Sequence, residues 1–516
     1  MRASGIILHI SSLPSPYGIG TFGRQAREFA DLLARAGQSY WQVLPLHPTG
    51  YGDSPYQALS AFAGNHYFID LDLLAEEGLL KPEELPVPDG SDPSRVDYSL
   101  LSRERLAVLR RAYARFIEWP NPDFIRFVAD EIDWLRDYAL FMALKEQHGG
   151  EEWTRWEPDI RLRKLPALKK ASAELRDEIT FHYFLQYEFF RQWDALRSDC
   201  AGKGIRLIGD VPIYVPLDSA DVWANPELFQ LDEELTPTAV AGCPPDRFNE
   251  DGQLWGNPLY DWQAMAGTGY GWWLRRLRAA ARMYDVVRLD HFRGFESYWA
   301  VPFGAPNARE GEWRPGPGMD FIRTVREALP ELSFIAEDLG FLTPEVLKLR
   351  EDSGFPGMKV LEFAFDPEEP SQYLPHSYDS RCVCYTGTHD NAPLTQWYAS
   401  LTEEERAFAR DYLALTEAEG VAWGVIRGGM GSVAELFMAQ MQDYLPTRYS
   451  ARMNEPGYVN ELNWRWRLTP GAVDGATVRR IRELTERYGR IPAADMPGTV
   501  RETEAQAGPP RAEAGE

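Results

Sequence analysis

Short apolar runs punctuate the chain, separated by longer stretches in which polar and apolar residues mix. Eight runs are strand-like, because they are short and rich in β-branched or aromatic side chains. Most are continuously apolar rather than alternating, which is typical of parallel strands covered on both faces. In chain order the predicted strands are Gly5–Ile10, Tyr40–Leu46, Ile205–Ile213, Val286–Phe292, Ser333–Leu339, Lys359–Phe365, Val383–Thr388 and Thr447–Met453.

Amphipathic helical patterns lie between many of these runs. Apolar positions recur with a helical period in Gln25–Ala36, Trp273–Met283, Phe321–Ala328 and Thr343–Asp352. Alternating strands and helices are typical of a parallel α/β fold, and eight strands can close into a barrel. The pattern therefore predicts an α/β fold of the (β/α)8 TIM-barrel class.

Two long connections interrupt this pattern. The segment 75–200 after the second strand is rich in Leu, Ala, Glu and Arg at helical spacing, with a Pro- and Asp-rich loop at Lys81–Ser94. We expect a mostly helical inserted subdomain there. The segment 217–260 is rich in Pro, Gly, Asp and Trp without clear periodicity, which predicts a long active-site loop insertion. We assign the catalytic barrel to 1–495 and expect 496–516, which has few bulky side chains, to be a disordered tail.

Composition and charge exclude several classes of partner. A formal net charge of −24 disfavours nucleic acid and gives no reason to expect an anionic membrane surface, so a neutral substrate fits better. No stretch approaches the ~20 apolar residues of a membrane span, and the N-terminal apolar run is too short for a signal peptide. We therefore expect a cytoplasmic protein.

The sequence offers no motif for a metal or a cofactor. Cys382 and Cys384 lie close together, but no second Cys/His pair completes a zinc site, and Cys200 and Cys243 stand apart. The glycine-rich stretch Gly267–Gly271 follows no predicted strand, so a turn is favoured over a phosphate-binding loop. We expect reduced thiols and no metal or cofactor.

Three carboxylic acids end or follow predicted strands. Asp290, Glu337 and Asp390 come at the C-terminal ends of the fourth, fifth and seventh runs. In a parallel barrel these ends share one face, which carries the active site. Three acids at one mouth suit the cleavage of a glycosidic bond, in which they act as nucleophile, acid/base and stabiliser of the sugar cation.

The neighbours of two acids suggest different roles. Arg288, two residues before Asp290, favours the ionised carboxylate that a nucleophile requires, although a purely structural ion pair gives the same pattern. Glu337 leaves an apolar strand, so burial and nearby acids should raise its pKa and keep it protonated as a general acid. The alternative for Glu337 is a helix cap. Its neighbour Asp338 competes for the role, but adjacent strand residues point to opposite sides.

His389 precedes Asp390 directly and offers an imidazole beside a carboxylate. This pair suits contacts with sugar hydroxyls in the distorted ring of the transition state. No Gly-x-Ser-x-Gly nucleophile elbow is present, and two adjacent residues make a poor chelate. Neither a Ser–His–Asp triad nor a metal site is favoured.

Longer motifs around these acids carry a family resemblance that covers nearly the whole chain. The chain resembles 4-α-glucanotransferases of the amylomaltase (disproportionating enzyme) type, glycoside hydrolase family 77, in the α-amylase clan. The motifs, in family order, are Leu13–Gly20, Gly52–Tyr56, Gly209–Ile213, Asp218–Trp223, Gly256–Tyr260 and Arg452–Asn454.

The resemblance implies transfer of α-1,4-glucan segments between maltooligosaccharides by a retaining double displacement, without a metal, by a protein that we expect to be a monomer. It implies that Asp290 is the nucleophile, Glu337 the general acid/base and Asp390 the transition-state stabiliser. The matching sugar-contact positions are Ser54, Tyr56, Tyr98, Asp210, Trp255, Arg288, His291, His389 and Asn463, with Tyr51 at a secondary glucan-contact site.

The chain departs from the family pattern at two places, and two other functions stay open. His47 stands where the family usually has Gly and is interpreted as a rim residue, and the loop before Asn463 is one residue longer than usual. An α-amylase-like hydrolase uses the same acids with water as acceptor, although the loop motifs favour transfer. A non-catalytic glucan-binding protein is disfavoured because all three acids are present.

Overall fold

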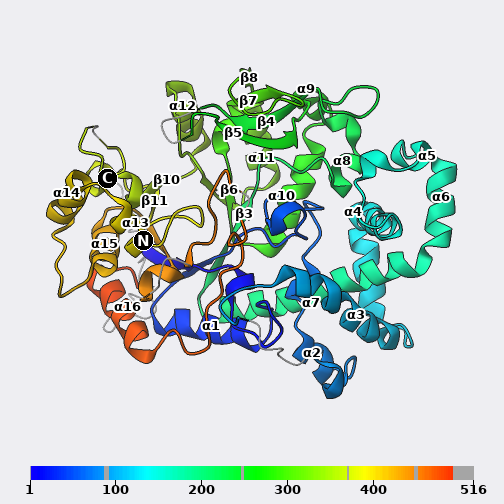
Figure 1. Cartoon of the computed structure of the whole chain (residues 1–516), viewed down its shortest axis with the longest axis horizontal. Helices are drawn as coiled ribbons and strands as arrows, with labels where there is room; N and C mark the ends of the chain where they lie inside the picture. The colour runs from blue at the N-terminus through cyan, green and yellow to red at the C-terminus, as the bar shows by residue number, and fades with distance from the viewer. Residues whose placement is uncertain are drawn as a thin grey trace, which may run out of the picture.

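The computed structural model describes residues 2–86, 92–245, 249–368, 371–446, 451–458 and 460–491. Its parallel strands close a barrel in the spatial order β1-β12-β11-β10-β9-β6-β3-β2, with helices packed around it (Figure 1). The predicted (β/α)8 TIM barrel is confirmed. The barrel strands are β1 (Ala3–Ile7), β2 (Tyr40–Gln42), β3 (Arg206–Val211), β6 (Val286–Leu289), β9 (Ser333–Ala336), β10 (Gly357–Val360), β11 (Cys382–Tyr385) and β12 (Leu436–Gln440).

The predicted position of the eighth strand is wrong. The strand that closes the barrel is β12, whereas the predicted segment 447–453 follows it, and residues 447–450 lie outside the described residues. The residues of β12, Leu-Phe-Met-Ala-Gln, include strong helix formers. Their strand conformation comes from pairing with β1 on one side and β11 on the other, which overrides the local preference.

The interior of the barrel is filled by side chains from the strands. A buried cluster collects Ile7, Ile208, Val286, Ile335, Met358, Val360, Val383, Tyr385 and Met438. Alternate positions on the same strands face outward and join the larger core under the helices. Burying one such aliphatic side chain stabilises the fold by about 1.5–3 kcal/mol. Burial on both faces explains why the strands are continuously apolar.

The four predicted helices are present and cover the barrel as α1 (Arg24–Arg35), α10 (Gly271–Met283), α11 (Gly318–Ala328) and α12 (Pro344–Ser353). The ends of α12 follow directly from its sequence. Thr343 accepts a hydrogen bond from the backbone N–H of Val346, and Pro344 occupies the first helical position. Gly354 then ends the helix in a left-handed conformation with φ of 72°. The remaining helices after β10 are α13 (Leu394–Ser400), α14 (Glu403–Leu413), α15 (Val421–Gly431) and α16 (Gly475–Arg487).

The connection between β2 and β3 is mostly helical, as predicted. Its helices extend from one side of the barrel, at the right of Figure 1. The long helix α7 contacts α1, α3, α4 and α10, so it joins the insertion to the barrel. The helices of the insertion are α2 (Leu71–Glu76), α3 (Tyr98–Phe116), α4 (Pro122–Gln147), α5 (Pro158–Arg161), α6 (Leu165–Glu174) and α7 (Arg176–Gly202).

A second, antiparallel sheet lies beside the barrel, near the top of Figure 1. It has the order β5-β4-β7-β8, and the sequence pattern predicts only loops in its first part, 217–260. The central strand β4 pairs with β7, which follows the fourth barrel strand, so the sheet depends on contacts that no local pattern encodes. Its strands are β4 (Ala239–Cys243), β5 (Gln253–Pro258), β7 (Ser297–Pro302) and β8 (Glu312–Pro315), with helices α8 (Ala220–Ala224) and α9 (Trp262–Gly267) nearby in the chain.

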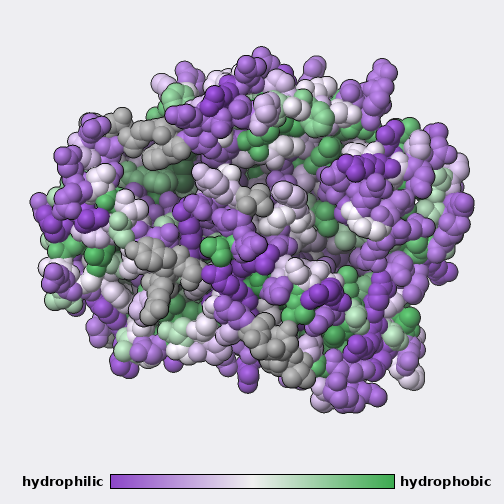
Figure 2. All heavy atoms as spheres, in the orientation of Figure 1, coloured by the Kyte–Doolittle hydropathy of each residue, from purple (hydrophilic) through white to green (hydrophobic). Residues whose placement is uncertain are grey.

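The face of the molecule shown in Figure 2 is mostly hydrophilic. Hydrophobic side chains gather on it over the second sheet. The exposed apolar residues of the sheet region include Leu254, Phe303 and Trp313. No helix in the described ranges is both long enough and apolar enough to cross a bilayer. The predicted tail, 496–516, lies outside the described residues.

Candidate active site

Backbone hydrogen bonds hold two of the predicted acids side by side. Asp290 and Glu337 directly follow the adjacent strands β6 and β9. The pairing continues past the strand ends, because the Glu337 N–H donates to Leu289 O and the Phe292 N–H donates to Glu337 O, both at 3.0 Å. Both acids therefore lie at the C-terminal mouth of the barrel.

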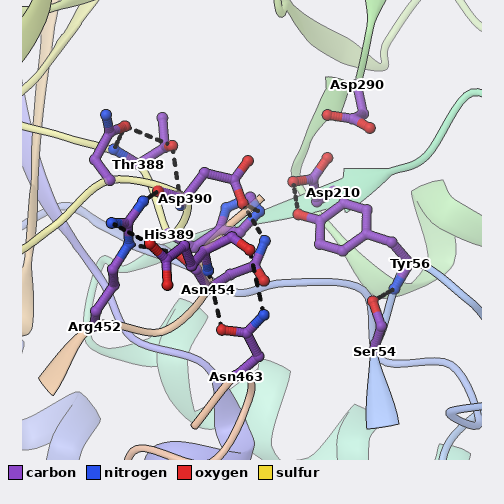
Figure 3. A network of polar contacts seen from close by, with 12 residues as sticks. Ser54, Tyr56, Asp210, Asp290, Thr388, His389, Asp390, Arg452, Asn454 and Asn463 are labelled. Carbon is purple, nitrogen blue, oxygen red and sulfur yellow. Dashed lines mark hydrogen bonds and ion pairs between the residues drawn. The ribbon is translucent and has the colours of Figure 1, made fainter. Parts of the chain in front are cut away.

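Arg288 links Asp290 to a second, fully buried carboxylate. Its Nη1 lies 2.6 Å from Asp210 Oδ2 and 2.8 Å from Asp290 Oδ1. Burial alone would lower the pKa of Arg288, but Asp210 and Asp290 raise it well above its usual range. Tyr56 donates from its hydroxyl to Asp210 Oδ2 at 2.7 Å, and Figure 3 shows this contact. Asp290 keeps 27% of its side chain exposed, so it remains accessible at the end of a fixed network.

Glu337 is buried among groups that act on its charge in opposite directions. The backbone N–H of His291 donates to Oε2 at 2.7 Å and that of Leu339 donates to Oε1 at 2.9 Å. Burial raises the pKa of Glu337 to about 7, and Asp290 adds to the shift, whereas Arg288 and the two backbone N–H donors oppose it. His291 has a left-handed backbone with φ of 50°, as the residue at the turn that follows Asp290. Near neutral pH Glu337 can both give and take a proton.

The competing acid, Asp338, bonds to neighbouring elements of the barrel. Its Oδ1 accepts from the Met358 N–H at 2.7 Å, and its Oδ2 lies 3.2 Å from Arg350 Nη1. The carboxylate is buried and ties β9 to β10 and α12. Asp338 therefore has structural partners that account for it without a role in the chemistry.

The third acid, Asp390, lies in the loop after β11. Asn454 donates to its Oδ1 at 2.6 Å, and Arg452 donates to its backbone carbonyl at 2.6 Å (Figure 3). His389 Nε2 lies 3.3 Å from the same carboxylate oxygen. The His389 ring stacks on Tyr56 with centroids 5.1 Å apart, so Tyr56 contacts both the Asp210 and the His389 side of the site.

Two further predicted residues border the acids. The Trp255 ring of β5 meets the His291 ring edge to face, with centroids 4.8 Å apart. Burial lowers the pKa of His291 to about 4, which keeps the imidazole neutral. Ser54 accepts from the Tyr56 N–H at 3.2 Å and so orders the turn that presents Tyr56. The second sheet and the β2 loop thus both contribute side chains to the mouth.

Of the three remaining predicted glucan-contact residues, one is exposed and two bond to the backbone of other residues. Tyr51 is 76% exposed. Tyr98 is buried and donates to the carbonyl of Trp464 at 3.2 Å. The amide of Asn463 bonds to the backbone of Glu455 and Tyr458, which holds the loop before it. Trp464 accepts from Tyr98 and directly follows Asn463 in the chain.

Some side chains at the site were not predicted as sugar contacts. The Trp464 ring lies 5.7 Å from Tyr56 and 5.9 Å from His389, centroid to centroid. Arg452 and Asn454, which hold Asp390, belong to the Arg-Met-Asn motif, so a signal for them was present in the sequence. His47 is buried beneath the loops, not on the rim as predicted, and its Nδ1 lies 2.8 Å from Ala63 O.

No arrangement that could hold a metal ion occurs among His, Cys, Asp and Glu side chains in the described ranges. Cys200, Cys382 and Cys384 are buried thiols. The described side chains at the site are carboxylic acids, the guanidinium groups of Arg288 and Arg452, the amide of Asn454, imidazoles and aromatic rings. This set can stabilise a sugar cation and move a proton, which is the chemistry of glycosidic-bond cleavage.

Comparisons with known proteins agree with this chemistry. A sequence model of the family described as "4-alpha-glucanotransferase" matches residues 8–473. The 4-alpha-glucanotransferase of Thermus thermophilus is 50% identical over 94% of this chain and 99% of its own length. That of Clostridium butyricum is 47% identical over 94% of this chain and all of its own.

Solved structures give the same result. The amylomaltase from Streptococcus agalactiae, in complex with acarbose, superposes with a TM-score of 0.93 at 40% identity, over 95% of this chain and all of that one. The amylomaltase from Corynebacterium glutamicum has the same fold, with a TM-score of 0.72 at 21% identity over 95% of this chain and 74% of that one. The chain belongs to the 4-α-glucanotransferases of glycoside hydrolase family 77.

Proposed function

We propose that this enzyme transfers α-1,4-glucan segments between maltooligosaccharides through a covalent glucosyl-enzyme, with Asp290 as nucleophile, Glu337 as acid/base and Asp390 as stabiliser. The observation that carries the assignment is the contrast between two adjacent acids. Arg288 binds Asp290 at 2.8 Å, whereas burial gives Glu337 a pKa of about 7. One group is held ready to attack and the other holds a proton.

In the first step, a carboxylate oxygen of Asp290 attacks the anomeric carbon of the donor glucan. The bond from that carbon to the glycosidic oxygen breaks, and Glu337 gives its proton to the departing 4-oxygen. The shortened glucan leaves, and a β-linked ester joins the transferred segment to Asp290. The anomeric carbon is inverted once.

In the second step, the 4-hydroxyl of an acceptor glucan attacks the same carbon. Glu337 takes the hydroxyl proton, the new glycosidic bond forms and the ester to Asp290 breaks. The second inversion restores the α configuration. A pKa near 7 suits both proton transfers, because the same group must act as acid and then as base.

Asp390 and His389 are the proposed contacts to hydroxyls of the distorted sugar ring. Asn454 and Arg452 fix the side chain and backbone of Asp390, so little reorganisation is needed when charge develops on the sugar. The proposed sugar-binding surface continues over Tyr56, Trp255 and His291. We further propose contacts at Ser54, Tyr51, Tyr98, Asp210, Arg288 and Asn463.

Incubation with maltotriose tests the function. Transfer yields glucose together with maltooligosaccharides longer than maltotriose, whereas hydrolysis yields only shorter products. Asp290→Asn should abolish both products while the circular dichroism spectrum stays that of the wild type. Products from Asp290→Asn would rule out this nucleophile, and binding of maltoheptaose by the wild type without turnover would favour a non-catalytic glucan-binding protein.

We also propose that the enzyme acts as a monomer in the cytoplasm, without nucleic acid or membrane partners. A net charge of −24 supports the absence of polyanionic partners, and the buried thiols of Cys382 and Cys384 suit a reducing compartment. Size-exclusion chromatography with light scattering should give a mass near 58.8 kDa. A mass twice that value would contradict the monomer.

A further inference from the structure

A carboxyl group that the mechanism does not use lies behind the loop that carries His389 and Asp390. We call residues 386–394, which run from the end of β11 to the first residue of α13, the Asp390 loop. Glu362 lies in the short 3-10 helix Leu361–Phe363 that follows β10. Its backbone N–H donates to Thr386 O at 3.2 Å, and its carbonyl accepts from Trp397 Nε1 at 3.1 Å. Glu362 is thus fastened to the start of the loop and to the helix after it.

The carboxyl of Glu362 packs directly against the Asp390 loop. A Cβ atom at Gly387 would lie 2.7 Å from Glu362 Oε1, closer than real side chains approach. The carboxyl also hydrogen-bonds to the Asn391 side chain. Asn391 Oδ1 accepts from the backbone N–H and the hydroxyl of Thr388, both at 2.9 Å. Glu362 therefore supports the loop through the residues on both sides of His389 and Asp390.

A second buried carboxyl, Asp443, fixes the two ends of the same loop. Asp443 lies in the 3-10 helix Met441–Tyr444 after β12. Its Oδ2 accepts from the Thr386 hydroxyl at 2.6 Å and its Oδ1 accepts from the Leu394 N–H at 2.8 Å. Both oxygens are stabilised by donors, as an ionised carboxylate requires.

A negative charge on Glu362 has less stabilisation, because the Asn391 side chain donates to only one of its two oxygens. Its Oε1 is buried and has no hydrogen-bond partner in the described ranges. The charged groups that face it are Asp443, which repels a second negative charge, and Arg452. Two donor groups of Arg452 already hydrogen-bond to the backbone carbonyls of Asp390 and Asn454. Burial first and Asp443 second raise the pKa of Glu362 well above its usual range, while burial raises that of Asp443 to about 6.

We propose that Glu362 is a positioning residue, which works as an uncharged hydrogen-bonding group and holds the Asp390 loop so that His389 and Asp390 face the cleft. Asp443 carries the negative charge of the pair and Glu362 carries the proton. The effect on catalysis rests on the proposed roles of Asp390 and His389. The uncharged state of Glu362 does not depend on those roles, because it follows from the burial of Glu362 near Asp443.

This assignment makes an amide a functional substitute for the acid. Glu362→Gln keeps the length, the hydrogen bonding and the neutrality of the side chain. Glu362→Met keeps the length but removes the bond to Asn391, so the loop loses its support. Glu483 supplies a matched control, because Glu483→Gln makes the same chemical change at an exposed position on α16.

The first measurement is kcat and KM for maltotriose disproportionation by wild type, Glu362→Gln, Glu362→Met and Glu483→Gln. We expect Glu362→Gln to stay within about threefold of wild-type kcat and Glu362→Met to lose about ten- to a hundredfold, as small displacements of catalytic groups do. Equal losses in Gln and Met would mean that the charge is required. Wild-type activity in Glu362→Met would mean that the residue positions nothing. Either result overturns the proposal.

The second measurement is Tm between pH 4.5 and pH 9, which does not depend on activity. A carboxyl whose pKa is raised in the folded state stabilises the fold at low pH, and this contribution is lost as pH rises above the unfolded value. Glu362→Gln should match wild type near pH 4.5 and exceed it at pH 8, by about 1–3 °C. Glu483→Gln should show no such pH-dependent gain. A lower Tm for Glu362→Gln at pH 8 would overturn the neutral state. A wild type without transfer activity would instead refute the proposed function.

Discussion

Glu337 is the single residue whose protonation matters most for the proposed chemistry. It must carry a proton when the donor bond breaks, and its pKa of about 7 means that half of the free enzyme has lost that proton near neutrality. As pH rises through this value, the fraction of competent enzyme falls. We therefore expect kcat/KM for maltotriose to decline above about pH 7 on an alkaline limb that reports Glu337.

Glu337→Gln should lower kcat for maltotriose by about 10²–10⁴-fold, because a positioned acid contributes that much. A donor such as α-glucosyl fluoride, whose leaving group needs no proton, should react with the wild type without the alkaline limb of the first step. Persistence of the same limb with the fluoride would assign it to a group other than Glu337.

Asp338 provides the contrast with Glu337 at the next position in the chain. Asp338→Ala removes the acceptor of the buried Met358 N–H and the partner of Arg350. Leaving such groups unpaired costs about 2–3 kcal/mol. We expect a clear fall in the free energy of unfolding by urea, with kcat for maltotriose within a few-fold of wild type. A large loss of kcat at unchanged stability would make Asp338 part of the chemistry.

At the level of elements, the local sequence pattern predicts a strand correctly where the tertiary contacts favour the same conformation. β6 and β9 are apolar and β-branched, and both were predicted with the acids that follow them. β12 was misplaced because its sequence has helix formers, and only pairing with β1 and β11 makes it a strand. The second sheet was missed for the same reason, since β4 finds its partner β7 more than fifty residues along the chain.

The site could likewise be predicted only where its features are local in the sequence. Strand-end acids and the spacing of Arg288 and Asp290 are local features, so they could be identified. The contact of Tyr56 with Trp464 joins segments about four hundred residues apart, and no local pattern encodes it. Glu362 had a local signal, a lone glutamate within the apolar run Lys359–Phe365. The run indicates burial, but the opposing Asp443 is brought there only by the closed barrel.

The Asp390 loop is an element whose shape depends on one close approach. A side chain at Gly387 would meet Glu362 Oε1 at 2.7 Å and Asn391 Cβ at 2.8 Å. Gly387→Ala should therefore displace the loop, lowering kcat and costing about 1–3 kcal/mol of stability through overpacking. Because part of the clash is with Glu362, the double variant Gly387→Ala, Glu362→Ala should be less destabilised than the sum of the two single variants. Additive effects in thermal unfolding would show that the two positions do not contact each other.

At the scale of the whole molecule, the barrel is closed by strands from opposite ends of the chain. β1 and β12 pair over residues Ala3–Ile7, and no covalent connection shorter than the whole barrel joins them. Arg490, after α16, reinforces this seam. It is fully buried and donates to Ala3 O at 2.8 Å, Met430 O at 2.9 Å and Ser432 O at 3.1 Å. It also lies beyond residue 473, where the family match ends.

Arg490→Met should therefore loosen the closure of the barrel without touching the site. The variant keeps an apolar stem of similar length but removes the side-chain donor to Ala3 O, while Met430 O and Ser432 O keep only Arg2 as a side-chain donor, at a cost of about 1–3 kcal/mol. We expect Tm to fall by roughly 1–3 °C, and amide hydrogen exchange to rise first in β1 and β12. Arg479→Met, an exposed change on α16, should alter stability by less than about 0.5 kcal/mol. Exchange that rises evenly over all barrel strands would mean that the seam opens only when the whole barrel unfolds.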